Sequence, residues 1–226
     1  MKKEVRTLIL IAIIVVLVGV AGTLVYRQSS QNAAAPLPQR PDNTEKLIRP
    51  DSATLGPADA KVTVVEFLDP ECEACAAFAP TVKKIISDYP QVRFVFRYMP
   101  FHRNARLAAS YIEAAGEQGK YWEMTDIMLR KQSEWGEIHG AGPQPVRPPA
   151  ETVFQNFGKE IGLDVDQLKS SAADPKHGAK ADRDMKDGRE LGVRKTPSFF
   201  VNGRLMPGLD ERTLRAMINE ELAKQQ

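Results

Sequence analysis

The sequence predicts an α/β fold in which a β-α-β unit and a later β-β-α unit flank a long helical block. Three observations carry this prediction: an apolar, β-branched run at residues 61–68, a helical period over about residues 104–191, and an Asn202-Gly203 turn between two short apolar runs near the C-terminus. Of the 226 residues, 42% are hydrophobic and 27% are charged. This is the composition of a globular protein, and the length suits one domain with appendages.

The N-terminal segment is predicted to anchor the chain in a membrane. Residues 8–26 are uncharged and largely apolar, and their number is close to the ~20 residues that a helix needs to cross a bilayer. Lys2, Lys3 and Arg6 precede this run, so the positive-inside rule keeps residues 1–7 in the cytoplasm. We therefore expect a single-pass protein of the inner (cytoplasmic) membrane, with its C-terminal domain in the periplasm or extracytoplasmic space. A cleaved signal peptide is the alternative.

Residues 27–57 are interpreted as a linker, because they are rich in proline, alanine and glutamine and such segments form semi-rigid extended spacers. The folded domain is accordingly expected at residues 58–226. Four of the 31 basic residues but only one of the 29 acidic residues lie in residues 1–27, so the rest of the chain has a slight acidic excess. We therefore expect no nucleic-acid partner.

The first half of the folded domain predicts a parallel pair of strands joined by a helix. Residues 61–68 have apolar side chains at both odd and even positions, which is typical of a central strand covered on both faces. The run stops at Asp69-Pro70. Residues 76–89 have apolar side chains at helical spacing, with Pro80 expected to kink the helix. Residues 92–98 are the second strand, so a right-handed β-α-β crossover follows.

The helical block begins at Asn104, which we expect to cap its first helix. Glycines and prolines divide the block, with a proline-rich loop at residues 136–149 and Asp174 as the cap of its last helix. After the block, the sequence again has the pattern of short strands, and the chain ends with an amphipathic helix. The remaining segments are expected at residues 152–161, 164–172 and 174–191 (helices), 196–201 and 204–206 (strands), and 210–223 (helix).

The two cysteines of the chain are predicted to form a redox pair. Cys72 and Cys75 lie at the start of a helix that follows a central strand. There, unsatisfied backbone N–H groups and the helix dipole stabilise the first thiolate, while the second thiol, one turn along, can resolve a mixed disulfide. A zinc site needs two more ligands, and the histidines are scattered, so we predict no metal and no cofactor. His102 is interpreted as a surface residue.

Further residues give this pair a family context. Glu66 lies six residues before Cys72, Pro80 lies eight after it, and Thr196-Pro197 precedes the C-terminal hairpin. Together these features resemble the thioredoxin fold, and the long inserted helical domain resembles the DsbA-like thiol:disulfide oxidoreductases. The resemblance covers about residues 55–223.

The resemblance assigns roles to individual residues. It implies that Cys72 and Cys75 form the redox-active disulfide, that Glu66 is the buried acid under Cys75, and that Pro197 is the cis-proline packed against the disulfide. Thr196 is implied as a substrate contact through its backbone. From the residues alone, Glu66 is either functional or at an exposed strand end, and Pro197 is either cis or an ordinary trans proline entering an edge strand.

The sequence between the cysteines departs from the family pattern. Strongly oxidising members commonly carry Pro-His there, whereas this chain has Glu73-Ala74, with Asp69 and Glu71 close by. Negative charges oppose a thiolate, so we expect a less depressed pKa for Cys72 and an intermediate reduction potential.

The function expected from these features is that of a thiol:disulfide oxidoreductase facing the periplasm, most simply an oxidase or isomerase. Its substrates would be protein thiols or disulfides. Its redox partner would be a membrane protein, either a quinone-linked oxidase or a reductase. Two alternatives stay open: a thiol reductase of the cytochrome c maturation type, and a non-enzymatic copper carrier that uses the same cysteines.

Overall fold

The computed structural model describes residues 44–137 and 146–225. The predicted membrane span at residues 8–26, most of the predicted linker, and the middle of the proline-rich loop lie outside these ranges. Within them, no helix combines the length and the apolar character that crossing a membrane requires.

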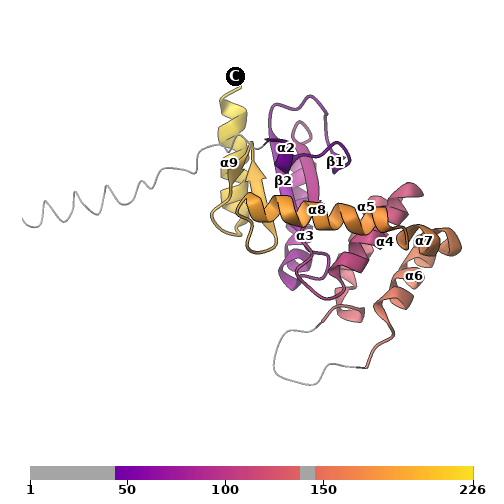
Figure 1. Cartoon of the computed structure of the whole chain (residues 1–226). Coiled ribbons are helices and arrows are strands. Elements are labelled where there is room, and N and C mark those ends of the chain that lie inside the picture. The colour runs from indigo at the N-terminus through magenta and orange to yellow at the C-terminus, as the bar shows by residue number, and fades with distance from the viewer. Residues whose placement is uncertain (1–43, 138–145, 226) are drawn as a thin grey trace, which may run out of the picture. The chain divides into compact units, whose positions relative to one another are not determined.

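A five-stranded mixed sheet forms the centre of the described domain, in the order β1-β3-β2-β4-β5 (Figure 1). Strands β2 and β3 are parallel, and the other neighbours are antiparallel. The predicted β-α-β unit and C-terminal hairpin are therefore present. The strands are β1 Ala53–Leu55, β2 Thr63–Leu68, β3 Arg93–Tyr98, β4 Ser198–Val201 and β5 Arg204–Leu205.

Helices cover both faces of the sheet, which explains why the central strands have apolar side chains on both of their faces. Helices α3 and α9 pack on one face, where Val64, Phe94 and Phe199 share a core with Val82 and Ile218. Helices α2 and α8 cover the other face around a smaller core of strand residues. Their bounds are α2 Thr44–Leu47, α3 Glu73–Asp88, α8 Pro175–Glu190 and α9 Glu211–Ala223.

The predicted helical block is present between β3 and β4 and has a core of its own. Trp135 packs edge-on against Phe154 at a centroid distance of 4.8 Å, and both belong to a buried cluster that includes Met124 and Leu168. The helices of the block that precede α8 are α4 Ala105–Glu117, α5 Tyr121–Arg130, the short 3₁₀ helix η1 Gln132–Glu134, α6 Ala150–Glu160 and α7 Val165–Ala172.

Two of the expected helix caps differ in their outcome. Asp174 accepts a hydrogen bond from the backbone N–H of Lys176, with Pro175 in the first position of α8, as predicted. Asn104 makes no capping hydrogen bond with its side chain. Its side-chain amide donates instead to Glu71 at 2.8 Å, because a buried carboxylate there requires donors.

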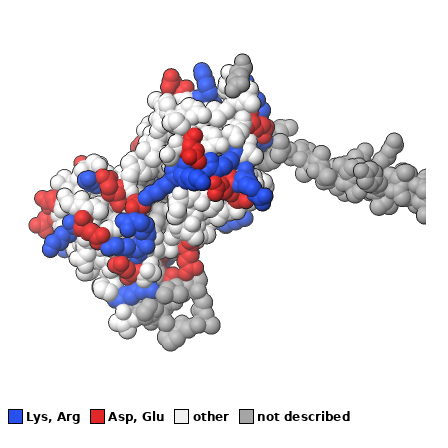
Figure 2. Space-filling view, turned by 180° about the vertical axis from the view of Figure 1, so that it is seen from behind, with Lys and Arg blue, Asp and Glu red and all other residues white. Residues whose placement is uncertain are grey.

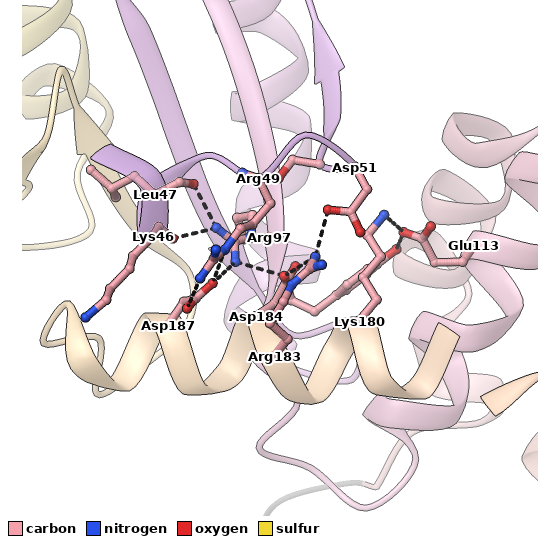
Figure 3. A network of polar contacts seen from close by, with 12 residues as sticks. Lys46, Leu47, Arg49, Asp51, Arg97, Glu113, Lys180, Arg183, Asp184 and Asp187 are labelled. Carbon is pink, nitrogen blue, oxygen red and sulfur yellow. Dashed lines mark hydrogen bonds and ion pairs between the residues drawn. The ribbon is translucent and has the colours of Figure 1, made fainter. Parts of the chain in front are cut away.

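The folded domain begins earlier in the chain than the sequence predicted. Helix α2 and strand β1 fall within residues 27–57, which were expected to be linker. Arg97 explains why this segment belongs to the folded domain. Its guanidinium is fully buried and donates to the carbonyls of Lys46 and Leu47. It also donates to the carboxylates of Asp184 and Asp187 (Figure 3). The segment before β1 thus supplies acceptors for a buried cation, and proline content alone cannot reveal this.

Candidate active site

The two cysteines lie where the central strand passes into α3. Cys72 is the N-cap residue of α3 and has an extended backbone. Its N–H donates to the carbonyl of Asp69 at 3.1 Å, which closes the turn after β2. Both cysteines are free thiols, and Cys72 is 9% exposed whereas Cys75 is 2% exposed. The more accessible sulfur is therefore the one at the helix N-terminus.

The surroundings of Cys72 favour its thiolate. A hydrogen bond from the Cys75 thiol is the largest influence and, against the opposing effect of burial, the pKa of Cys72 falls to about 5. The Thr196 side chain and the backbone N–H groups of Ala74 and Cys75 contribute in the same direction. These amides are the unsatisfied donors of the first turn of α3, as the sequence predicted. At neutral pH, Cys72 is therefore a thiolate and a nucleophile.

Cys75 and Glu66 hold their protons. Burial raises the pKa of Cys75, and its hydrogen bond to Cys72 and the charges of Cys72 and Glu66 raise it further. Burial also raises the pKa of Glu66 to about 8. Glu66 is 8% exposed on β2, so the structure excludes the alternative of an exposed strand end. A neutral buried carboxyl near Cys75 can give a proton to that sulfur or take one from it.

Thr196 and Pro197 reach the cysteines through the register of the sheet. Strand β4 runs antiparallel to β2 with Phe67 opposite Ser198, so the residues just before β4 lie beside the end of β2. The Thr196–Pro197 peptide bond is cis, which excludes the ordinary trans proline. Cys72 Sγ lies 3.4 Å from the Thr196 carbonyl oxygen, to which the thiol donates when it is protonated. The structure thus assembles all the residues that the sequence predicted for the site.

Asp69 and Glu71 were predicted to oppose the Cys72 thiolate with their charges, and the structure shows them as hydrogen-bond acceptors within the active-site turn. Both are fully buried and accept hydrogen bonds from backbone N–H groups, and neither is among the main influences on the pKa of Cys72. Asp69 accepts from Phe101 at 2.7 Å and from His102 at 3.1 Å. The pKa of about 5 for Cys72 still lies above the ~3.5 of the strongest oxidants.

Glu71 connects the active-site turn to the helical block. Its carboxylate accepts from the backbone N–H of Asn104 at 2.5 Å and from that of Glu137 at 3.0 Å. Next to it, the side-chain amide of Gln132 donates to the carbonyl of Pro70 at 2.9 Å. The two residues before Cys72 are therefore held by groups from the start of α4 and from the segment around η1.

His102 is a residue of the site that the sequence analysis missed. Its Nδ1 lies 2.7 Å from Asp69 Oδ2, and its side chain is 22% exposed, so His102 is a half-buried residue that contacts the active-site turn. Partial burial lowers the pKa of His102, but the hydrogen bond and charge of Asp69 and the charges of Cys72 and Glu71 outweigh burial and raise it. Asp69 and His102 follow the carboxyl ends of the parallel strands β2 and β3. That shared edge was the available signal.

In the part of the chain that the structure describes, no group of three or more His, Cys, Asp or Glu side chains is arranged to hold a metal ion. The ligand-capable residues of the site are instead engaged with one another, as in the Asp69–His102 pair.

The fold and the site together define the class of protein. A C-x-x-C pair at a helix N-terminus, beside a cis-proline that enters an antiparallel strand, is the arrangement of a thioredoxin-type dithiol protein. A family model described as Thioredoxin matches residues 49–220. The chain therefore belongs to the thioredoxin family.

Relatives and solved structures agree with this placement. The chain is 26% identical to disulfide bond formation protein D of Bacillus subtilis, over 74% of this chain and 76% of that protein. A thioredoxin-like oxidoreductase from Silicibacter pomeroyi superposes with a TM-score of 0.66 at 29% identity, over 81% of this chain and 99% of that one. The thiol-disulfide exchange protein alpha-DsbA2 of Wolbachia pipientis shares the fold, with a TM-score of 0.65 at 24% identity, over 78% and 90% of the two chains. These neighbours confirm the predicted DsbA-like resemblance.

Other relatives are much longer proteins. The chain is 37% identical to the Na(+)/H(+) antiporter NhaA 1 of Salinispora arenicola over 153 residues, which are 66% of this chain and 21% of the antiporter. The chain thus spans about a fifth of the length of these relatives.

Proposed function

We propose that the protein is a thiol:disulfide oxidoreductase that exchanges disulfides with protein substrates through Cys72 and Cys75, acting as an oxidase or isomerase. The observation that carries the proposal is the asymmetry of the pair. Cys72 has a pKa of about 5, whereas the pKa of Cys75 is raised. A sulfur that is stable as a thiolate is a good leaving group, which favours release of an oxidised substrate.

The proposed exchange begins with the Cys72–Cys75 disulfide. A substrate thiolate attacks Cys72 Sγ, the Cys72–Cys75 bond breaks, and Cys75 leaves with the electron pair. Cys75 takes the proton of Glu66, because burial raises the pKa of both groups. A second substrate thiolate then attacks the substrate sulfur of the mixed disulfide, and Cys72 leaves as a thiolate. The substrate has lost two electrons to the pair, and its protons pass to solvent and to Glu66.

Thr196 and Pro197 support the substrate in this proposal. The Thr196 carbonyl lies 3.4 Å from Cys72 Sγ, so the backbone of Thr196 is placed to pair with an extended segment that contains the reacting cysteine. Pro197 is buried behind it and has no N–H to satisfy. The substrate cysteine would thus meet Cys72 along the edge that leads into β4.

Regeneration of the disulfide requires an oxidant, which we propose to be a quinone-linked membrane protein. This partner fits the proposed location: a single-pass anchor at residues 8–26, with the domain in the periplasm. The support is the uncharged run and the basic residues that precede it. A fully reduced Cys72–Cys75 pair in living cells would overturn the oxidising direction and favour the reductase alternative.

Replacement of Cys75 by Ala tests the proposed function. Without the resolving thiol, Cys72 should remain bound to its substrates as mixed disulfides, which appear as bands of higher mass that reductant removes. Cys72→Ala is the matched control and should trap nothing. Absence of mixed disulfides in the Cys75→Ala chain, together with stoichiometric retention of Cu(I) by the unaltered chain, would favour the copper carrier instead.

A further inference from the structure

A small pocket is lined by residues from the loop after β3 and from the segment that leads from α8 into β4, and it has no part in the exchange described above. Phe101, Arg189, Val193 and Arg194 line it, and its volume is about 250 Å³. Phe101 belongs to the loop after β3, and its N–H donates to Asp69 at 2.7 Å. Arg194 belongs to the loop that leads into β4. The pocket therefore adjoins one loop that contacts Asp69 and another that leads to Thr196.

The distance from the pocket to the reacting sulfur is short along the chain. Arg194 is two residues before Thr196, and two residues span at most about 7 Å. Thr196 in turn lies against Cys72, with its carbonyl oxygen 3.4 Å from Sγ. An extended segment bound along Thr196 would therefore place a residue near its own cysteine over the pocket.

The pocket is basic and its cations are not neutralised within the described residues. Its two cations, Arg189 and Arg194, are exposed, and no carboxylate among residues 44–137 and 146–225 pairs with either of them. One guanidinium nitrogen of Arg194 donates to the carbonyls of Arg189 at 2.7 Å and Val193 at 3.0 Å, which fixes that group at the end of α8. Elsewhere, as on the face in Figure 2, many basic side chains lie next to acidic ones.

The pocket also exposes apolar surface. Phe101 is 40% exposed and is one of four large hydrophobic residues that are more than a third exposed among the described residues. An exposed ring gains free energy when another apolar side chain covers it, at about 25 cal/mol per Å² of buried surface. The pocket thus combines an apolar wall with unpaired cations, which fits an apolar side chain next to a carboxylate.

We propose that this pocket selects protein substrates whose reacting cysteine lies within two or three residues of an acidic residue and a large apolar residue. The inference rests on the proposed function and adds a substrate class to it. Segments with a basic residue in the same position are repelled by Arg189 and Arg194. Charge complementarity of this kind acts mainly through partner choice and association rate.

The experiment compares two cysteine peptides of equal length, one with Asp-Phe and one with Lys-Phe before the cysteine. The oxidised full-length chain in detergent reacts with each, and the rate of thiol loss is measured at low ionic strength. Because a neighbouring charge alters the peptide thiol itself, each rate is divided by that of the same peptide with the uncharged 2-hydroxyethyl disulfide. We expect the acidic peptide to react at least about tenfold faster, which corresponds to about 1.4 kcal/mol.

Charge reversal assigns the preference to the pocket. Arg189→Glu and, separately, Arg194→Glu should reduce or invert the ratio of the two rates. Arg189→Glu leaves the contacts of the Arg194 guanidinium in place, so it serves if Arg194→Glu fails to fold. Lys61→Glu is the matched control, because Lys61 is exposed at the opposite end of β2, about 20 Å away along the strand. It should leave the ratio unchanged.

Reaction with dithiothreitol separates this inference from the proposed function. If dithiothreitol reduces the Cys72–Cys75 disulfide normally but the two normalised peptide rates are equal, the pocket has no selective role and the inference fails alone. The same holds if the charge reversals leave the ratio unchanged. If neither peptide exchanges with a disulfide that dithiothreitol reduces, the proposed function fails and the inference fails with it.

Discussion

His102 shows how a single side chain can act on the reactive sulfur through its neighbours. Its imidazole is held at 2.7 Å by the buried carboxylate of Asp69, and the charge of Cys72 helps to raise the pKa of His102. Charge interactions are mutual, so the imidazolium stabilises the Cys72 thiolate. Family members with Pro-His between the cysteines carry a histidine within the motif, whereas here it comes from the loop after β3.

Replacement of His102 by Gln should therefore raise the pKa of Cys72, by roughly one unit for one nearby charge. The titration of thiolate absorbance at 240 nm in the reduced chain measures this shift. His177→Gln is a suitable control, because His177 pairs with Glu117 in the helical block and should leave the titration unchanged. An unaltered Cys72 titration in the His102 variant would show that this residue only supports the turn.

Glu66 makes the stability of the chain depend on pH. Burial raises its pKa from 4.5 to about 8, so its contribution is fully present below pH 4.5 and is lost as the pH rises through about 8. Glu66→Gln removes the titration. In the oxidised form, where neither cysteine carries a thiol, the variant should gain stability relative to the unaltered chain as the pH rises from 4.5 to 9, by on the order of 5 kcal/mol.

Urea unfolding at several pH values measures this gain. Glu134→Gln removes an exposed carboxyl and should give parallel curves. The Glu66 variant should also exchange disulfides roughly 10- to 100-fold more slowly at neutral pH, because Cys75 loses its proton donor. A pH-independent stability difference for Glu66→Gln would contradict the assignment of a neutral buried acid.

At the scale of the elements, Arg97 joins segments that are far apart in the sequence. It lies on β3 and contacts α2 and α8, and Arg49 adds a second cation at 2.7 Å from Asp187 (Figure 3). Truncation of one member of such a network leaves the others buried and uncompensated. The network therefore holds helix α8 and the segment before β1 on the same face of the sheet.

Arg97→Met is expected to destabilise the domain by about 3–5 kcal/mol, since Asp184 and Asp187 lose their buried partner. Arg106→Met is matched to it, because Arg106 also pairs with a carboxylate of α8, Asp182, but both side chains are more than half exposed. That variant should lose less than about 1 kcal/mol. Urea unfolding measures both values, and equal losses would contradict the role given to burial.

At the scale of the whole molecule, the reduction potential follows from the ionisation of Cys72. The thiolate stabilises the reduced chain relative to the oxidised chain, and a pKa of about 5 lies between the ~3.5 of DsbA and the ~7 of thioredoxin. We expect a potential between roughly −120 and −270 mV. Equilibration with glutathione or dithiothreitol buffers measures it.

The pH dependence of the stability of the reduced chain also reports the ionisation of Cys72. The depressed pKa of Cys72 stabilises the reduced chain fully above its ordinary pKa of 9.0, and this stability is lost as the pH falls through about 5. The unfolding free energy of the reduced chain, minus that of the oxidised chain, should therefore fall as the pH is lowered from 9 to 5. A constant difference over this range would contradict the low pKa.

Local sequence was sufficient for most of the elements and for the reactive pair. The strand before Cys72, the helix after it and the Asn202-Gly203 hairpin all follow from periodicity and turn residues, which act over a few positions. The spacing of Glu66, Cys72 and Cys75 along one strand and one helix is likewise local. The predicted elements are confirmed by the described residues, and the roles of Glu66, Cys72 and Cys75 stay predictions.

Contacts between segments distant in the chain were decided by the tertiary structure alone. Residues before β1 join the sheet because Arg97 needs their carbonyls, and His102 meets Asp69 because two parallel strands end at the same edge. The sequence by itself determined the chemistry of the site, because a C-x-x-C pair and a helix N-terminus are local features. Its charges and neighbours depended on the fold, because electrostatic partners are set by distance in space and not by position in the chain.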